Sequence, residues 1–213
     1  DVLSHHPSIG VWCAHNEPVP TDRGSNPSGA EVKARGRRTL AGQFMPGWNR
    51  TVLDASVART LEKADGSRPV IASSGLLPVN LGQSDTHLSL GWYEGKAGDL
   101  AGTLARWPRL ARFVSGFGAQ AMPSDAPEWL GAHRWPDLEW DRLARDHNLQ
   151  PSVLFSRVPP SEYATYAEWR DATQRYQADL LRTQIETLRR LKYRPTGGFC
   201  AYLLADAHPA ITW

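Results

Sequence analysis

Short apolar runs alternate with helical patterns along the chain. The runs are continuous rather than interrupted by polar residues, which is typical of strands covered on both faces of a parallel sheet. Between them, apolar residues recur at three- and four-residue spacing, as at Val52, Leu53, Val57 and Leu61. The pattern predicts strands over 8–13, 69–73, 86–90, 111–115 and 199–204, and helices over 48–64, 99–107, 138–147 and 163–192. The last segment would be about 45 Å long as one helix, too long for a barrel helix, so we expect two helices or a kink.

Strands that alternate with helices predict an α/β fold, built from βα units around a parallel sheet. The first predicted strand lies close to Asp1, and the last lies close to Trp213. A five-stranded parallel sheet with two open edges is poorly suited to stand alone. We therefore expect residues 1–213 to be one partial domain, the second half (strands 4–8) of a TIM (β/α)8 barrel.

The composition is that of a globular protein and argues against two classes of partner. Hydrophobic residues make up 41% and charged residues 22%, and the formal net charge of +2 is too small to indicate nucleic-acid binding. No apolar run approaches the roughly 20 residues that span a bilayer. The first residues also lack the basic and apolar regions of a signal peptide. The sequence thus predicts neither a nucleic-acid nor a membrane partner, and it leaves the cellular location open.

Cysteine and tryptophan usage adds two observations. Cys13 and Cys200 are too few for a disulfide framework and belong to no C-x-x-C pair. Each lies in an apolar run, so we expect buried free thiols. The chain has nine tryptophans, and this residue stacks on the apolar faces of sugars as well as packing cores. The count therefore favours a ligand with a flat apolar face.

The segment 112–123 (RFVSGFGAQAMP) has two interpretations. Gly116, Gly118 and Ala121 stand at the G-x-G-x-x-A spacing of a dinucleotide-binding turn. Such a turn leads directly into a helix whose first N–H groups bind the pyrophosphate. Here Pro123 and Pro127 fall where that helix would continue, and proline breaks a helix interior. The context favours the other interpretation, the carboxyl end of a barrel strand, where active-site side chains lie.

The densest polar group follows the first predicted strand: His15, Asn16 and Glu17. A carboxylate beside an amide at the carboxyl end of a strand suits a barrel active site, because Glu can donate a proton while Asn binds a substrate hydroxyl. The alternative is a metal-dependent hydrolase, since His5, His6, His15 and Glu17 cluster in sequence. Neither H-x-x-x-H nor H-E-x-x-H occurs, and H-x-E lacks the P-C-x-x-C of zinc deaminases. We therefore predict no cofactor and no metal.

Further candidates lie in the region of the third predicted strand, in the segment that follows it, and after the last predicted strand: Asp85, His87, Trp92, Tyr93, Asp206 and His208. The adjacent Trp92 and Tyr93 would suit a sugar-binding platform, but two aromatic rings that close a barrel fit the sequence equally well. Asp206 and His208 are either ligand-binding residues or ordinary loop residues.

Five segments, taken in order, resemble the barrel of glycoside hydrolase family 2, the group of β-galactosidase, β-glucuronidase and β-mannosidase. They correspond to the regions of strands four to eight: HPSIGVWCAHNEP (6–18), SRPVIASSG (67–75), DTHLSLGWYEG (85–95), RFVSGFGAQAMPS (112–124) and GGFCAYLLADAHPAITW (197–213). The first and fourth segments are the specific ones. The resemblance implies a retaining β-glycosidase barrel with a carbohydrate substrate or glycan ligand. It also implies a longer parent chain that holds the first half of the barrel and β-sandwich domains.

The resemblance implies roles for individual residues. Glu17 falls on the general acid/base, and Asn16 on the residue that binds the 2-hydroxyl of the sugar. The nucleophile of the family belongs in a Ser-Glu-Phe-Gly sequence at the end of the seventh strand. This chain has SGFG at 115–118, so Gly116 occupies the place of the nucleophile and has no side chain to attack with.

Two further positions depart from the family. Ser89 and Leu90 stand where a tyrosine usually lies near the nucleophile, and His208 replaces a tryptophan common in the closing loop. Loss of this tyrosine together with the nucleophile favours natural drift over a single engineered substitution.

Retaining hydrolysis requires two carboxylates about 5 Å apart, one as acid/base and one as nucleophile. Removal of a covalent nucleophile lowers the rate by several orders of magnitude. Three explanations stay open: a non-catalytic glycan-binding relative, an engineered glycine, or another carboxylate that acts as base in an inverting reaction, with Glu94, Asp125 and Glu128 as candidates. We expect a domain that acts on or binds β-linked glycosides with impaired or altered hydrolysis.

Overall fold

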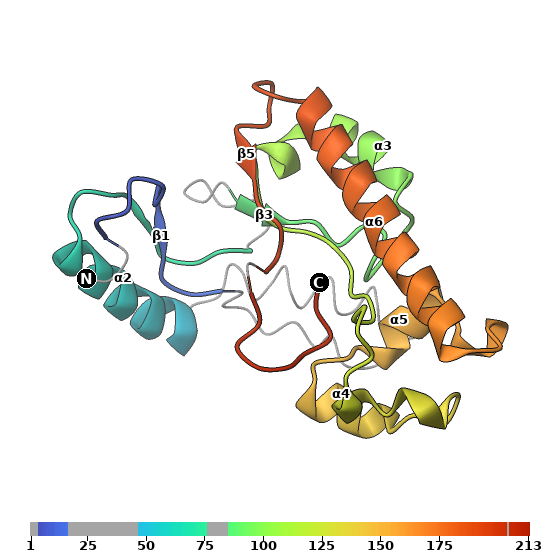
Figure 1. The fold of residues 1–213 in the computed structure, drawn as a ribbon. Helices are drawn as coiled ribbons and strands as arrows, with labels where there is room; N and C mark the ends of the chain where they lie inside the picture. Colours follow the sequence, from blue (N-terminus) through green and yellow to red (C-terminus); the bar gives the residue numbers. More distant parts are fainter. Residues whose placement is uncertain (1–3, 17–46, 76–84, 204) are drawn as a thin grey trace. The chain divides into compact units, whose positions relative to one another are not determined.

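The computed structural model describes residues 4–16, 47–75, 85–203 and 205–213 (Figure 1). The chain divides into two compact units, Asp1–His87 and Leu88–Trp213. Helices and parallel strand pairs occur in both units, which confirms the predicted α/β class. In the described part of the chain, no helix has the length and apolar character that crossing a membrane requires.

The first unit contains a β–α–β arrangement. Strand β1 (Trp12–Cys13) pairs in parallel with β2 (Val70–Ile71), with Trp12 opposite Val70. Between them in the chain, a π-helical turn (Asn49–Leu53) leads into helix α2 (Asp54–Ala64), and strand β3 (Asp85–His87) ends the unit. A further parallel bridge joins Asn16 to Ser74, so the pairing continues past the carboxyl ends of β1 and β2.

A polar cluster fixes the connection between α2 and β2. The carboxylate of Asp65, just after α2, accepts hydrogen bonds from Trp12 Nε1 (2.8 Å) and from Arg68 (2.8 Å). The same guanidinium donates to the carbonyls of Ile9 (2.7 Å) and His6 (2.9 Å). Asp65 and Arg68 thus tie the segment before β1 to the turn before β2, and this sets the register of the two strands.

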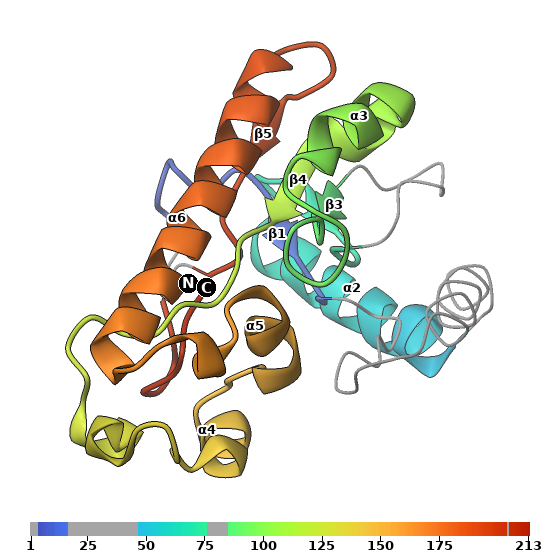
Figure 2. The same cartoon turned by 90° about the vertical axis from the view of Figure 1, so that its right-hand side faces the viewer.

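The second unit joins two parallel strands by a long helical connection. Helix α3 (Asp99–Arg106) and a 3₁₀ turn (Pro108–Ala111) lead into β4 (Phe113–Gly116), which pairs with β5 (Gly198–Phe199). The connection from β4 to β5 contains α4 (Trp140–Asp146), α5 (Pro151–Arg157) and α6 (Tyr166–Arg190). Short 3₁₀ turns occur at Glu128–Leu130, Ala132–Arg134 and Pro160–Glu162. In Figure 2, α4 and α5 lie near the start of α6, away from the strands.

Helix α6 is a single helix of 25 residues, so the prediction of two helices or a kink was wrong. Its start is defined by a capping box. The side chain of Thr165 accepts from the backbone N–H of Glu168, and the Glu168 carboxylate accepts from the backbone N–H of Thr165 at 3.0 Å. This cap keeps 163–165 out of the helix, although their side chains fit the helical spacing.

Two apolar clusters stabilise the second unit. One surrounds β4 and buries Val114 against Leu100 and Leu104 of α3 and Leu188 of α6. The other lies between α4, α5 and the first half of α6, and its centre is Trp169, which is fully buried. Trp135, Trp140, Phe155 and Tyr166 pack edge-on or tilted against this ring. A large share of the tryptophans therefore serves packing, and their number does not by itself indicate a ligand.

Three details differ from the sequence-based expectations. The strands are shorter than predicted, and helix α5, which begins at Pro151, was not predicted. Neither cysteine forms a disulfide, as expected, but both are exposed, so the prediction of buried thiols was wrong. Each lies at or just beyond the end of a short strand, where the chain leaves the sheet.

Candidate functional site

The first unit places several of the predicted polar residues at the carboxyl ends of β1 and β2. His15 and Asn16 directly follow β1, and the backbone N–H of Ser74 donates to the His15 carbonyl at 2.8 Å. Asn16 is exposed, and the His15 side chain is a quarter exposed. Glu17, the predicted acid/base, lies outside the described residues.

A buried carboxylate orients His15. Asp54, the first residue of α2, is 2% exposed, and its Oδ1 lies 2.6 Å from His15 Nδ1. A carboxylate on one ring nitrogen fixes the orientation of an imidazole and leaves the other nitrogen for a ligand. Asp54 was missed in the sequence because the apolar spacing around it indicated only a helix. Its signal was an acidic residue in the first turn of a helix that follows the polar strand end.

Asp85 is the centre of a second polar group. It is 3% exposed, and its Oδ2 accepts from Ser74 Oγ (2.6 Å) and from the backbone N–H of Gly75 (3.0 Å). The same hydroxyl lies 3.4 Å from His87 Nε2. The structure therefore brings together two residues predicted from the sequence, Asp85 and His87, with a serine from the end of β2 that was not predicted.

In the described part of the first unit, the buried side chains are polar. Among its described residues, those classed as buried are Asp54, Ser73, Ser74, Asp85 and Thr86. Buried polar side chains cost free energy unless they are hydrogen-bonded, so a set of this kind is typical of a site rather than of a core. Cys13 lies in the same region. Partial desolvation, together with the carboxylates of Asp85 and Asp54, raises the pKa of its thiol, which makes Cys13 a poor nucleophile at neutral pH.

The second unit contains the glycine segment after β4. Gly116 is buried, and its carbonyl accepts from the backbone N–H of Leu88 at 2.8 Å. No helix follows: the described residues 117–127 are non-helical until the 3₁₀ turn at Glu128–Leu130. The segment after β4 therefore lacks the helix N-terminus that a dinucleotide-binding turn requires, as expected from the positions of Pro123 and Pro127.

Glycine is required at position 118 because of its backbone conformation, and not because a side chain would clash with its neighbours. Its φ of +136° is rarely adopted by residues with a side chain. An added Cβ would lie 3.6 Å from Leu181 and 3.8 Å from the Trp213 ring, both ordinary contacts. The Trp213 ring therefore lies next to the segment that follows β4.

Gln120 organises the loops beyond β4. It is fully buried, and its amide nitrogen donates to the carbonyls of Asn148 (2.7 Å) and Ile211 (3.0 Å). Its side-chain oxygen accepts from the backbone N–H of Gln150 at 2.9 Å. Sequence reasoning missed this residue because a single glutamine in an apolar run has no distinctive pattern.

Trp92 and Tyr93, the predicted sugar-binding platform, differ in how exposed their rings are. Trp92 is 1% exposed and donates from Nε1 to Gln150 Oε1 at 3.0 Å, so its ring offers no face to a ligand. Tyr93 is half-buried, and its hydroxyl accepts from Gln150 Nε2 at 2.9 Å. The rings of Tyr93 and Tyr202 lie 5.7 and 4.8 Å from the Trp213 ring, centre to centre, and both are tilted against it. Partly exposed aromatic surface is thus contributed by Tyr93, Tyr202 and Trp213.

The other candidate residues of this unit are on the surface. Asp206 and His208 are exposed, as are the alternative carboxylates Glu94, Asp125 and Glu128. The hydroxyl of Ser89, which stands at the tyrosine position of the family, donates to the Glu94 carboxylate. Within the described ranges, no three or more His, Cys, Asp or Glu side chains are placed to hold a metal ion.

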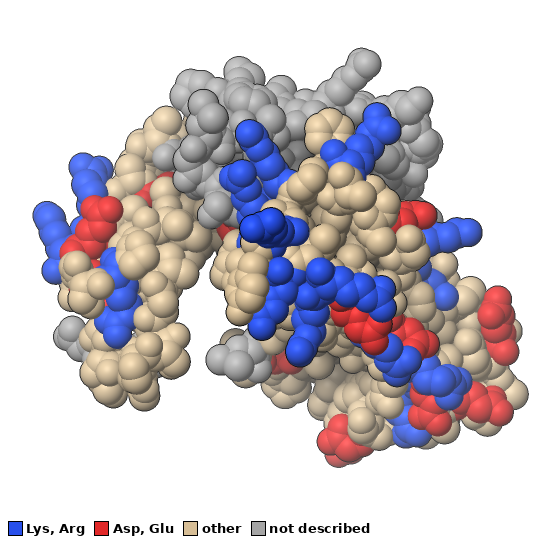
Figure 3. Space-filling model, turned by 90° about the horizontal axis from the view of Figure 1, so that it is seen from above, with Lys and Arg blue, Asp and Glu red and all other residues tan. Residues whose placement is uncertain are grey.

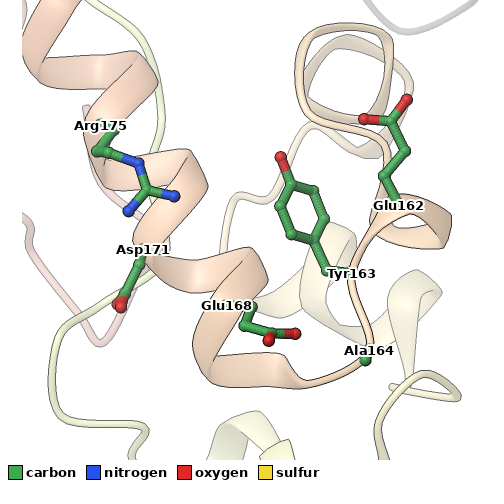
Figure 4. Close-up of a pocket in the computed structure, with 6 residues that line it drawn as sticks. All are labelled: Glu162, Tyr163, Ala164, Glu168, Asp171 and Arg175. Atoms are coloured by element: carbon green, nitrogen blue, oxygen red, sulfur yellow. The ribbon is translucent and has the colours of Figure 1, made fainter.

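A separate pocket lies at the start of α6 (Figure 4). Figure 4 shows Asp171 and Arg175 on α6, and Glu162 and Tyr163 on the segment that precedes it. Two of its carboxylates have structural roles, since Glu168 belongs to the capping box and Asp171 pairs with Arg170 at 2.7 Å. None of the residues predicted from the sequence lines this pocket.

Comparison with models of known protein families finds no match to the chain, and comparison with curated proteins finds none either.

Proposed function

We propose that the chain is part of a glycoside-hydrolase-type domain, the second half of a (β/α)8 barrel, which acts on or binds β-linked glycosides with impaired or altered hydrolysis. The observation that carries the proposal is the absence of a side chain at Gly116, in a segment that otherwise resembles the nucleophile strand of glycoside hydrolase family 2. The acid/base role goes to Glu17 and the 2-hydroxyl contact to Asn16, both from that resemblance.

The geometry of each unit supports this proposal. Both strand pairs are parallel, with helices in their connections, as barrel segments require. In the first unit, His15, Asn16 and Ser74 follow the carboxyl ends of β1 and β2. His15 contacts buried Asp54, and Ser74 contacts buried Asp85. In the second unit, partly exposed aromatic rings lie beside the segment after β4. Polar groups that bind hydroxyls and aromatic rings that stack on sugar faces are the features of a carbohydrate site.

Anion rescue tests the proposal without any change to the protein. An aryl β-glycoside should be hydrolysed slowly, and azide or formate should accelerate release of the phenol by occupying the space that a nucleophile would fill. Attack by azide on the face opposite the leaving group gives a glycosyl azide of inverted configuration, which NMR of the product identifies. The substrate panel should include galactosides, glucuronides and mannosides.

The Gly116→Glu variant is the complementary test. A correctly placed carboxylate should raise the unassisted rate by at least about 100-fold, because a held reactant has a high effective concentration. Gly116→Gln is the matched control, with the same volume and no nucleophilic oxygen anion. Efficient unassisted hydrolysis by the natural chain, with Gly116→Glu no faster, would place the chemistry on another residue. Saturable glycan binding without anion rescue would favour the non-catalytic alternative.

A further inference from the structure

The small net charge of the chain conceals a local concentration of cations. The chain has 24 Lys and Arg against 22 Asp and Glu. Segments 106–112 (RWPRLAR) and 189–194 (RRLKYR) hold three and four cations, respectively, and no carboxylate. We call these two segments the basic patch. The prediction of no nucleic-acid partner used only the net charge, and it did not take account of where the charges lie.

The fold brings both segments to the amino ends of β4 and β5. Arg112 directly precedes β4, and its carbonyl accepts from the backbone N–H of Gly197 at 2.8 Å, just before β5. A tight turn returns the chain from α6, with the N–H of Thr196 donating to the Leu191 carbonyl at 3.0 Å. Figure 3 shows Lys and Arg side chains gathered on the face seen from above, where α3, α6 and β5 meet in Figure 1.

The cations of the basic patch are exposed and largely free of carboxylates. All seven belong to exposed residues. Among the described residues, Arg190 pairs with Glu186 at 3.3 Å, and no ion pair involves the other six. The C-terminal dipoles of α3 and α6 favour cations in their last turns, namely Arg106, Arg189 and Arg190. The other four lie beyond the helix ends, where this effect is weak, so helix stability does not account for them.

Two exposed aromatic rings lie among these cations. Trp107 is 59% exposed and Tyr193 is 77% exposed, and Lys192 Nζ lies 4.8 Å from the Tyr193 ring centre. Exposed rings of this size between cations offer stacking surfaces for bases. Apart from these two rings, the basic patch contains no exposed large hydrophobic side chain. Six of the seven cations are arginines, whose planar guanidinium groups bind phosphate through two parallel hydrogen bonds.

We propose that the basic patch binds single-stranded nucleic acid, with the arginines on the phosphates and Trp107 and Tyr193 stacking on bases. This surface is at the amino ends of β4 and β5, whereas the residues proposed for glycoside chemistry follow the carboxyl ends of strands. The inference therefore does not depend on the glycosidase proposal.

Fluorescence anisotropy of a labelled thymidine oligomer of about 20 nucleotides measures the binding. With roughly four phosphates contacted, the association constant should fall about 50-fold between 50 and 200 mM salt. The double variant Arg109→Glu/Lys192→Glu should abolish measurable binding. Arg59→Glu/Lys63→Glu, two exposed residues of α2, makes the same change in net charge and should leave affinity within about twofold.

A second pair of variants tests the stacking. Trp107→Ala/Tyr193→Ala should weaken oligonucleotide binding at least about fivefold, because each stacked base contributes to affinity, and it should leave binding of inorganic polyphosphate unchanged. If Arg59→Glu/Lys63→Glu weakened oligonucleotide binding as much as Arg109→Glu/Lys192→Glu, the assignment of binding to the basic patch would be overturned. Polyphosphate bound as tightly as the oligomer, or binding only to vesicles with about one-third phosphatidylserine, would overturn the nucleic-acid assignment.

Discussion

At the scale of single residues, positions proposed for chemistry lie close in the sequence to residues that hold loops in place. Gly116 and Asn16 belong to the proposed site, whereas Gln120, in the same segment as Gly116, is fully buried and bonded to three backbone groups. A short stretch of sequence thus combines a position of the proposed site with a structural one, and the three hydrogen bonds of Gln120 mark the structural one.

Replacement of Gln120 by leucine should be strongly destabilising. The side chains are similar in size, but the change leaves two carbonyls and one N–H without their partner. We expect the free energy of unfolding to fall by roughly 3 kcal/mol, measured by urea denaturation. Gln177→Leu is a graded control, since Gln177 makes one such bond, to the Ala119 carbonyl (2.7 Å), and should cost about 1 kcal/mol or less. Equal effects of the two variants would contradict the role given to Gln120.

The sequence predicted some of the candidate residues and could not predict others. His15 follows β1, so the rule that barrel sites lie at the carboxyl ends of strands was enough to select it, whereas Asp85 and His87 lie within β3. Asp54 and Ser74 became visible only through contacts with His15 and Asp85, which lie 39 and 11 residues away in the chain. Trp92 shows the opposite case, because a residue chosen for sugar stacking is buried. Exposure depends on the tertiary structure, and local pattern does not determine it.

At the scale of secondary-structure elements, hydrophobic periodicity predicted which helices and strands occur better than it predicted the residues at which they begin and end. Each of the five predicted strands overlaps an observed one, although the last overlaps β5 by a single residue. The predicted helix at 48–64 is present as a π-helical turn followed by α2, and those at 99–107 and 138–147 are present in shortened form. The segment at 163–192 was misjudged because side-chain spacing continued through a capping signal. The Thr165-x-x-Glu168 motif was available in the sequence and would have placed the start of α6 correctly.

The contribution of the α6 capping box to stability should be measurable by itself. Thr165→Ala removes the acceptor for the Glu168 N–H and should lower the free energy of unfolding by about 1 kcal/mol. Thr183→Ala, which removes a hydroxyl bonded to the Asp179 carbonyl within the same helix, should change it by less than about 0.5 kcal/mol. If Thr183→Ala lowered the free energy of unfolding as much as Thr165→Ala, the capping box would contribute no more to stability than an ordinary hydroxyl within the helix.

The link between α2 and β2 should depend on pH. Hydrogen bonds from Ser67, Trp12 and Arg68 hold the pKa of Asp65 well below its usual range. Its contribution to stability is therefore complete above the ordinary carboxyl pKa of about 3.9 and is lost as the pH falls toward the lower folded value. The melting temperature of Asp65→Asn should lie below that of the natural chain at pH 6, and the gap should narrow steadily toward pH 2. Glu62→Gln replaces an exposed residue of α2, and its melting temperature should stay close to that of the natural chain from pH 6 to pH 2.

At the scale of the whole molecule, the two units differ in what they bury. The second unit has two apolar clusters, whereas the buried residues among the described part of the first unit are polar. Apolar burial is the main source of folding free energy, at about 25 cal/mol per Å². We therefore expect the second unit to be the more stable one.

Native-state hydrogen exchange checks this difference. The amide of Cys200, bonded to the Val114 carbonyl, and the central amides of α6 should exchange more slowly than those of Trp12 and Ala14, bonded to the carbonyls of Pro69 and Ile71. Protection should differ by at least about tenfold at pH 7. Addition of a bound glycoside should raise protection in the first unit if Asn16 and its neighbours hold the ligand. Equal protection in both units would mean that they unfold as one cooperative body.

The position of the two cysteines has a practical consequence. Cys13 belongs to the first unit and Cys200 to the second, neither forms a disulfide, both are exposed, and the chain has no other thiols. The natural sequence therefore carries one attachment point for a spectroscopic probe on each unit. A mixture of donor and acceptor maleimide dyes can label both thiols, with reaction at Cys13 favoured by higher pH because its pKa is raised. Energy transfer between the two dyes would then report the spacing of the units in solution, with and without a glycoside, on a protein that needs no mutation.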